Sequence, residues 1–273
     1  MMVMKHSTRG GLTAALAAAA LAAPAHAQSG DDWRFGLAIY GWFPAIDGQA
    51  SVPVQTGGAT IDASMGDVVD ALKFAFMGSF EARKGRWGLF TDLVYADFGA
   101  GKQGDRDFTL GGNRLPAGVS ADLNLDIKSW IWTFTGLYNL HDTPDATADL
   151  LFGGRYIDLE NALSWSFNGD ISNLPLPGRS GSGTADVNNW DAIVGVKGQF
   201  HFGADRRWYL PYYADVGAGE SKLTWQVMGG IGYRFDWGSL IASWRYLDYD
   251  FKSSAHVQDL SFSGPLVGVV FRF

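Results

Sequence analysis

The sequence predicts an all-β fold: an antiparallel transmembrane β-barrel of about ten strands, with eight to twelve possible. Three observations predict it. Aromatic residues make up 14% of the chain, glycine occurs 36 times, and the segments between turn signals alternate apolar and polar residues. A period of two, rather than a helical period of 3.6, favours antiparallel strands. Such alternation suits a wall with lipid on one face and a polar lumen on the other.

The first residues carry an export signal. Lys5 and Arg9 precede an alanine- and leucine-rich run that ends at Pro24, and Ala25, His26 and Ala27 form an A-x-A cleavage site. We expect a secretory signal peptide over residues 1–27 and the barrel domain over residues 28–273. A membrane-anchoring helix is the weaker alternative, because the apolar run is shorter than the roughly 20 residues that span a bilayer.

The composition limits the partners. Without residues 1–27 the chain has 19 basic and 28 acidic side chains, a formal net charge of −9, which argues against nucleic acid as a partner. The chain contains no cysteine, so disulfides and thiolate metal sites are excluded. We expect no cofactor and no metal. Outer-membrane lipids are the expected surroundings.

Ten strands are predicted in the mature chain. An even number returns both ends of a barrel to the same side of the membrane. Short connections, expected on the periplasmic side, alternate with longer ones over residues 44–72, 99–120 and 166–186, and a tight one over Gly217–Lys222. The short turns are Arg83–Arg86, His141–Asp145, Gly203–Arg206 and Asp236–Gly238. The strands cover residues 33–43, 74–83, 87–98, 121–139, 149–165, 187–202, 207–217, 223–235, 238–250 and 261–273.

The first long connection has structure of its own. Ile46–Val54 and Thr60–Ala63 could form a further hairpin, which would raise the strand count to twelve. Ser64–Asp67 fits a capping box, and Met65, Val68, Val69 and Leu72 follow the spacing of one helical face. A short helix is therefore predicted in the first outer loop, either restricting the barrel mouth or covering apolar loop side chains.

The last strand has the pattern of a closing barrel strand. Val267, Val269, Phe271 and Phe273 share one face, whereas Gly268 and Arg272 share the other. An aromatic final residue after such a strand looks like the end of an outer-membrane β-barrel, so we expect the protein in the outer membrane of a Gram-negative cell, reached through the periplasm. We expect the barrel assembly machinery to recognise this strand, which ends in Phe273.

Tryptophans fall at two levels, as expected for aromatic girdles at the two membrane surfaces. Trp33, Trp87, Trp208 and Trp237 begin outward-going strands and predict the inner girdle. Trp42, Trp165, Trp190 and Trp225 lie near the opposite strand ends and predict the outer girdle.

Many charged residues fall on the inward parity and predict an ionic network in the lumen. One strand departs from the pattern, because Trp130 and Trp132 share the parity of Lys128, and we expect a bulge or a change of environment there. The network could line a polar pathway that prefers anions at its inner mouth, or it could be a packed core of neutralised pairs. Its predicted members are Arg34, Glu81, Arg83, Asp92, Lys128, Arg155, Asp191, Lys197, Asp215, Arg234, Arg245 and Arg272.

Several segments together resemble a poorly characterised family of porin-like outer-membrane β-barrel proteins of Gram-negative bacteria. The resemblance spreads over nearly the whole mature chain and implies a location and an architecture, with no catalytic residues attached. The segments that carry it are residues 33–37, 74–78, 85–93, 211–217, 244–251 and 263–266.

An enzyme is not expected, although a lipid- or peptide-modifying hydrolase or acyltransferase is the alternative to passage of small polar solutes or a structural envelope role. The mature chain offers only His141, His201 and His256 as histidines, and no G-x-S-x-G or H-E-x-x-H motif occurs. Gly99–Gly104 matches G-x-G-x-x-G, but the helix that a phosphate cradle needs does not follow.

Overall fold

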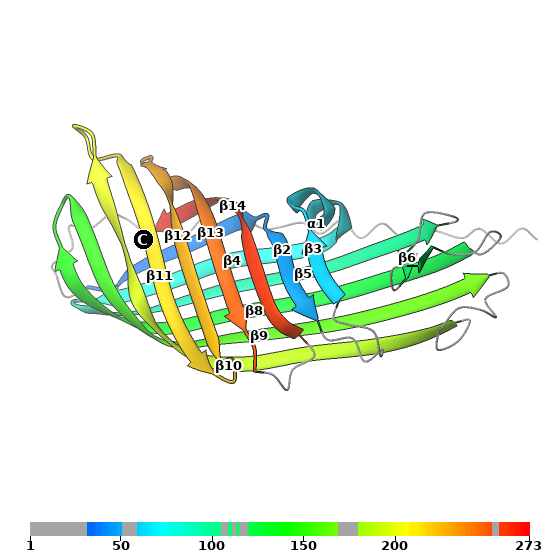
Figure 1. The fold of residues 1–273 in the computed structure, drawn as a ribbon. Coiled ribbons are helices and arrows are strands. Elements are labelled where there is room, and N and C mark those ends of the chain that lie inside the picture. The colour runs from blue at the N-terminus through cyan, green and yellow to red at the C-terminus, as the bar shows by residue number, and fades with distance from the viewer. Residues whose placement is uncertain are drawn as a thin grey trace, which may run out of the picture.

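The computed structural model shows a closed antiparallel β-barrel of ten strands (Figure 1). The ring closes where the first strand, β1 (Arg34–Trp42), pairs with the last, β14 (Val257–Arg272), from Gly36 opposite Arg272 to Trp42 opposite Leu266. The signal peptide predicted over residues 1–27, and His256, lie outside the described residues. The structure describes residues 32–50, 59–104, 109–110, 113–114, 120–168, 180–252 and 257–273.

All ten predicted strands are confirmed, and most extend beyond their predicted bounds. Each pairs with its neighbours in the order of the chain, apart from a hairpin inserted after β1. The remaining eight strands of the ring are β4 (Leu72–Lys84), β5 (Trp87–Gly104), β8 (Ser120–Asp142), β9 (Ala146–Asn168), β10 (Ser180–Phe202), β11 (Trp208–Gly219), β12 (Leu223–Arg234) and β13 (Ser239–Asp250).

At one end of the barrel, here called the short-turn end, every connection between described strands is short. The turns cover residues 85–86, 143–145, 203–207 and 235–238, as the sequence predicts. Gly85 and Gly203 adopt φ angles of +56° and +86°, a region that glycine enters without steric cost. The β1 start and the β14 end lie at this same end, as an even number of strands requires.

At the opposite, long-strand end, the neighbouring strands β5, β8, β9 and β10 continue far beyond the rest as a curved sheet (Figure 1). β8, β9 and β10 each contain 23 residues, whereas β11, β12 and β13 contain 12. The sequence predicts loops for part of this sheet, over residues 99–120 and 166–186, because small and polar residues there resemble turn signals. A two-stranded ribbon, β6 (Thr109–Leu110) and β7 (Asn113–Arg114), follows β5.

The alternative hairpin after β1 is present. β2 (Ala45–Ala50) pairs with the long-strand half of β14, and β3 (Ala59–Ala63) pairs with β2. It extends the sheet beside β14 and adds no strand to the closed ring. The predicted helix follows as α1 (Met65–Ala71), begun by a capping box between Ser64 and Asp67.

Helix α1 occupies a gap in the barrel wall at the long-strand end. It contacts β2, β3 and β5, while β3 has no pairing to β4 among the described residues. We call this helix-filled gap the seam. Val68 is the buried residue of the helix. Among the described residues, no helix is long and apolar enough to cross a membrane.

The outer face of the barrel is apolar. Trp33, Trp87, Trp208 and Trp237 are 42–60% exposed around the short-turn end, which confirms the predicted inner girdle. Of the four tryptophans of the predicted outer girdle, the side chain of Trp165 lies outside the described residues, and Trp42 is wrong. Trp42 is only 3% exposed, because its parity in β1 places it inside the barrel with Tyr40.

Of the bulge or change of environment expected in β8, the structure shows the change of environment and no bulge at these residues. β8 pairs with β5 and β9 in unbroken register through Lys128, Trp130 and Phe134, and the one register shift lies at Asn139–His141. Lys128 therefore shares the outer face with Trp130 and is exposed. The outward-facing residues of β8 are apolar along the barrel and become polar where the strand projects beyond it.

Candidate functional site: the luminal charges

Two arginine–aspartate pairs cross the middle of the lumen. Arg155 on β9 pairs with Asp215 on β11, and both side chains are 0% exposed. Arg155 also donates to the hydroxyls of Thr133 and Thr224, at 3.3 and 3.4 Å. A buried guanidinium is tolerated only when paired and hydrogen-bonded, and three strands supply those partners here.

The second pair joins β13 to β5. Arg245 donates to an Asp92 carboxylate oxygen at 2.9 Å, and to the side-chain oxygen of Gln226 through Nε at 3.0 Å and Nη2 at 2.7 Å. The Tyr40 hydroxyl donates to the other Asp92 oxygen at 2.5 Å, and the guanidinium lies 4.6 Å from the centroid of the Trp42 ring. Every polar atom of this carboxylate therefore has a partner.

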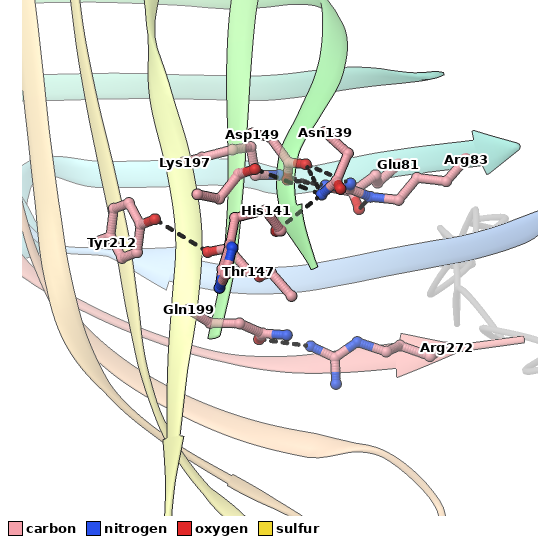
Figure 2. Close-up of polar contacts among 11 residues, drawn as sticks. Glu81, Arg83, Asn139, His141, Thr147, Asp149, Lys197, Gln199, Tyr212 and Arg272 are labelled. Atoms are coloured by element: carbon pink, nitrogen blue, oxygen red, sulfur yellow. Dashed lines mark hydrogen bonds and ion pairs between the residues drawn. The ribbon is translucent and has the colours of Figure 1, made fainter. Parts of the chain in front are cut away.

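A third group of ions lies nearer the short-turn end (Figure 2). Arg83 donates to both oxygens of Asp149, one of them at 2.8 Å, and also pairs with Glu81. Lys197 donates to the other Glu81 oxygen at 2.5 Å, and Asn139 donates to Asp149 at 2.9 Å. The two cations and two anions of this group are mutually neutralised.

An apolar layer lies in the lumen on the long-strand side of the central pairs. It is buried and comes from most strands around the ring, so that side chains meet across the barrel. Its members are Trp42, Met77, Val94, Ile131, Ile157, Leu159, Val187, Leu247, Tyr249, Phe251, Leu260, Phe262 and Leu266. A smaller buried group, Leu137, Leu151, Ile193 and Tyr213, packs between the central pairs and the short-turn end.

Polar groups without carboxylates gather at the short-turn end of the lumen. We call them the basal cluster: Gln199, His201, Tyr209, Arg234, Ser239 and Arg272. Arg234 donates to the His201 ring at 2.9 Å, and Arg272 donates to Ser239 and Gln199, each at 3.4 Å (Figure 2 shows the last contact).

The structure thus places the predicted luminal residues in several groups. Asp92, Arg155, Asp215 and Arg245 form the central pairs; Glu81, Arg83 and Lys197 form the third group; Arg234 and Arg272 belong to the basal cluster. Arg34 lies exposed at the short-turn end opposite Arg83 in the ladder. Asp191 is buried and accepts from the backbone N–H of Ser221 at 2.8 Å, and Lys128 lies on the outer face.

Sequence reasoning missed several members. Asp149 lies on the inward parity of β9 with Leu151 and Arg155, so the strand pattern could have included it. Tyr40 and Gln226 were on the mixed parity but were not chosen, because neutral polar residues give no charge signal.

The two described histidines lie at the short-turn end. His141 is 3.4 Å from the Thr143 hydroxyl, and His201 accepts from Arg234. Neither contacts a serine hydroxyl or a carboxylate among the described hydrogen bonds.

No family model and no curated protein matches the sequence. Among solved structures, the outer membrane protease OmpT from Escherichia coli is similar over 89% of this chain and 97% of its own, with 9% identity and a TM-score of 0.47. The translocator domain of the autotransporter NalP from Neisseria meningitidis matches over 90% of each chain, with 14% identity and a TM-score of 0.38. Ail of Yersinia pestis covers 89% of this chain and 99% of its own, with 9% identity and a TM-score of 0.30.

Proposed function

We propose that the protein is an integral outer-membrane barrel with an occluded lumen, which anchors an extended sheet at the cell surface. This is the structural envelope role, in preference to porin-like passage of small polar solutes. The observation that carries it is the complete burial of the Arg155–Asp215 pair beneath an apolar layer. A pathway for hydrated ions would leave its lining charges wet.

The filled interior supports a non-conducting barrel. Barrels of about eight strands are just wide enough for side chains to fill, and those of 16–18 strands hold an aqueous channel. In this ten-stranded ring, Ile131 is 2% exposed, and Ile157 and Leu247 are 0% exposed, although all three point into the lumen. Such a layer excludes water by its apolar contacts.

The outer face supports the location. Valine, leucine, isoleucine and phenylalanine side chains are exposed around the wall, with tryptophans near the short-turn end, as expected for a lipid-facing band and its girdle. Outer-membrane lipids are then its immediate partners, and β14 is the strand offered to the assembly machinery. The short turns face the periplasm in this orientation.

The long strands support the anchoring role. About 9–11 residues of a tilted strand cross a membrane, whereas β8, β9 and β10 have 23 residues each. Roughly half of each strand therefore projects outside, a reach of about 40 Å at about 3.3 Å per residue. A packed barrel gives that sheet a rigid base.

Planar-bilayer recording tests the occlusion. We expect refolded wild-type protein to give no discrete conductance steps at any voltage. The variant I131A/I157A/L247A, which removes bulk from the apolar layer, should admit ions and give measurable current. A matched control, F152A/V194A/V216A, removes bulk from exposed lipid-facing positions and should stay silent.

Steady wild-type channels whose ion selectivity changes in Arg155→Ala or Arg245→Ala would contradict occlusion and restore the pore hypothesis. Equal currents from the two triple variants would show that the apolar layer does not close the lumen. Heat-dependent gel mobility of each variant verifies that the barrel has folded.

A further inference from the structure

Within the described part of the chain, the arginines of the basal cluster lack the carboxylate partners that the other groups of luminal cations have. Arg83, Arg155, Lys197 and Arg245 each pair with a carboxylate inside the barrel. Arg234 and Arg272 have no carboxylate within ion-pair distance among the described residues. Their hydrogen-bond partners there are the neutral groups of His201, Ser239 and Gln199.

The nearby carboxylate of Asp145 binds a different arginine, Arg206. Asp145 lies in the turn before β9, where its backbone carbonyl accepts from the backbone N–H of His201 at 2.7 Å. Its side chain accepts from Arg206 at 2.7 Å, on the exposed rim. The two guanidinium groups of the basal cluster therefore keep their positive charge uncompensated by this residue.

Three buried polar atoms of the basal cluster lack a hydrogen-bond partner: Nε of Arg234, Nδ1 of His201 and the hydroxyl of Tyr209. The direction of the Arg234–His201 bond fixes their chemistry. Arg234 can only donate, so His201 Nε2 accepts, and the proton of the neutral ring must lie on Nδ1. All three unpaired groups are therefore available as donors, and what the cluster lacks is an acceptor.

Packing holds these groups together. His201 and Tyr209 are cross-strand partners whose ring centroids are 6.0 Å apart, and Arg272 lies 5.7 Å from the centroid of the Tyr209 ring. Tyr209 also lies over Gly232, where an added Cβ would come within 2.2 Å of the Tyr209 ring. The cluster is thus a built arrangement across β10, β11, β12, β13 and β14.

The geometry points to an oxyanion-binding site in the basal cluster, with a phosphate group as its ligand. A tetrahedral phosphate offers several acceptor oxygens and negative charge, and arginine binds it through parallel N–H groups. Arg234 and Arg272 supply the charge, while Tyr209 and His201 supply neutral donors. The site lies at the short-turn end of the lumen, where Arg272 is exposed, and does not depend on whether the lumen conducts.

Binding of inorganic phosphate to the full-length protein, folded in a non-ionic detergent, tests the site by calorimetry or by phosphorus NMR line broadening. We expect saturable binding of one phosphate per barrel. Arg234→Gln and Arg272→Gln should each weaken it at least about tenfold, since each removes a charge-assisted hydrogen bond. Tyr209→Phe, which keeps the ring, should weaken it severalfold.

Arg86→Gln is the matched control. Arg86 lies at the same end of the barrel, but its side chain is exposed and donates to the backbone carbonyl of Asn139. Phosphate affinity should not change in this variant. No saturable binding by the folded wild type would overturn the proposal, and so would an equal loss in Arg86→Gln, because that result describes diffuse attraction to a basic rim.

A second arm distinguishes the source of the phosphate. Short-chain phosphatidylglycerol, added as a soluble monomer, displaces inorganic phosphate if the site accepts a lipid headgroup. Binding of inorganic phosphate without such displacement supports a free phosphate as the ligand. If tyrosine and arginine variants fold normally, judged by heat-dependent gel mobility, yet bind like wild type, the basal cluster is not the site.

Discussion

Arg155 and Arg245 occupy the same position in two copies of one short pattern, Arg-Tyr-(Ile or Leu)-Asp, on strands β9 and β13. Each arginine points into the lumen and meets an aspartate of another strand, Asp215 or Asp92. The pattern therefore places two buried guanidinium groups at the middle of the barrel.

The other positions of the pattern also match. Tyr156 donates to Asp158 at 3.2 Å, and Tyr246 donates to Asp248 at 3.1 Å, in both cases on the outer face. Alternation along the strand explains the arrangement, since residues two apart share a face. One short sequence thus supplies an ionic group to the lumen and an aromatic–acid pair to the outer face.

Removing one member of a central pair should destabilise the barrel strongly. Arg155→Ala leaves the Asp215 carboxylate buried without its partner, and breaking such a pair costs about 3–5 kcal/mol. The double variant R155M/D215L replaces both charges by apolar groups and should recover most of that loss. Urea unfolding in lipid vesicles, followed by tryptophan fluorescence, measures both. Equal destabilisation by the single and double variants would contradict this account.

Gly232→Ala should disturb the basal cluster. Its new methyl group would come within 2.2 Å of the Tyr209 ring, which has no room to retreat because Tyr209 is 2% exposed. Overpacking of this kind costs about 1–3 kcal/mol. Gly229→Ala, on the same strand, meets no atom within 4 Å and is the control. The midpoint temperature of unfolding, measured by the heat-dependent shift in gel mobility, should fall in Gly232→Ala and stay unchanged in Gly229→Ala.

A charged residue introduced on the lipid-facing wall should lower the free energy of unfolding most at the middle of the membrane. Val194 is 50% exposed and lies beside Gly195, the cross-strand partner of Asp215, at the level of the central pairs. Val194→Arg should cost about 2–4 kcal/mol, whereas an arginine near an interface costs about 0–1 kcal/mol.

Leu223→Arg provides the comparison, because Leu223 begins β12 at the long-strand end and is 41% exposed. Vesicle unfolding measures both changes. Equal costs at the two depths would place the membrane elsewhere along the strands.

The capping box of α1 should control local opening of the helix. The Ser64 side chain accepts from the Asp67 backbone N–H at 3.3 Å, and Asp67 accepts in return from the Ser64 backbone at 3.1 Å. Ser64→Ala should cost about 1 kcal/mol, which raises amide exchange in the first helical turn about fivefold. Ser64→Thr keeps the hydroxyl and should leave exchange unchanged. No change in Ser64→Ala would show that packing of Val68 holds the helix instead.

Much of the fold could be predicted from alternation alone. Parity identified all ten strands of the ring, because a strand pattern specifies which face a side chain occupies. It also pointed to the charged residues that the structure buries: Asp92, Arg155, Asp191, Asp215 and Arg245. Position along a strand, taken with the strand direction, also specifies height in the barrel. The predicted inward position of Lys128 is wrong, because that prediction followed the charge of the residue and not its parity with Trp130.

Contacts across the lumen could not be predicted. Face and height do not say which strands lie opposite each other once the sheet closes, so Arg155 could not be assigned to Asp215, nor Arg245 to Asp92. The basal cluster was missed as a unit because its neutral members, Tyr209 and Ser239, carry no charge signal. The projecting sheet was missed because its small residues resemble those of loops.

The seam makes the barrel wall unequal around its circumference. The other described strands of the wall are joined by ladders of main-chain hydrogen bonds, but β3 and the start of β4 show no such ladder and are connected by the seven-residue helix α1. Side-chain packing around one buried valine gives way under milder conditions than a ladder does. A chaotrope should therefore separate β3 from β4 at the seam first. At the same concentration, β8, β9 and β10 should still be paired in their native register.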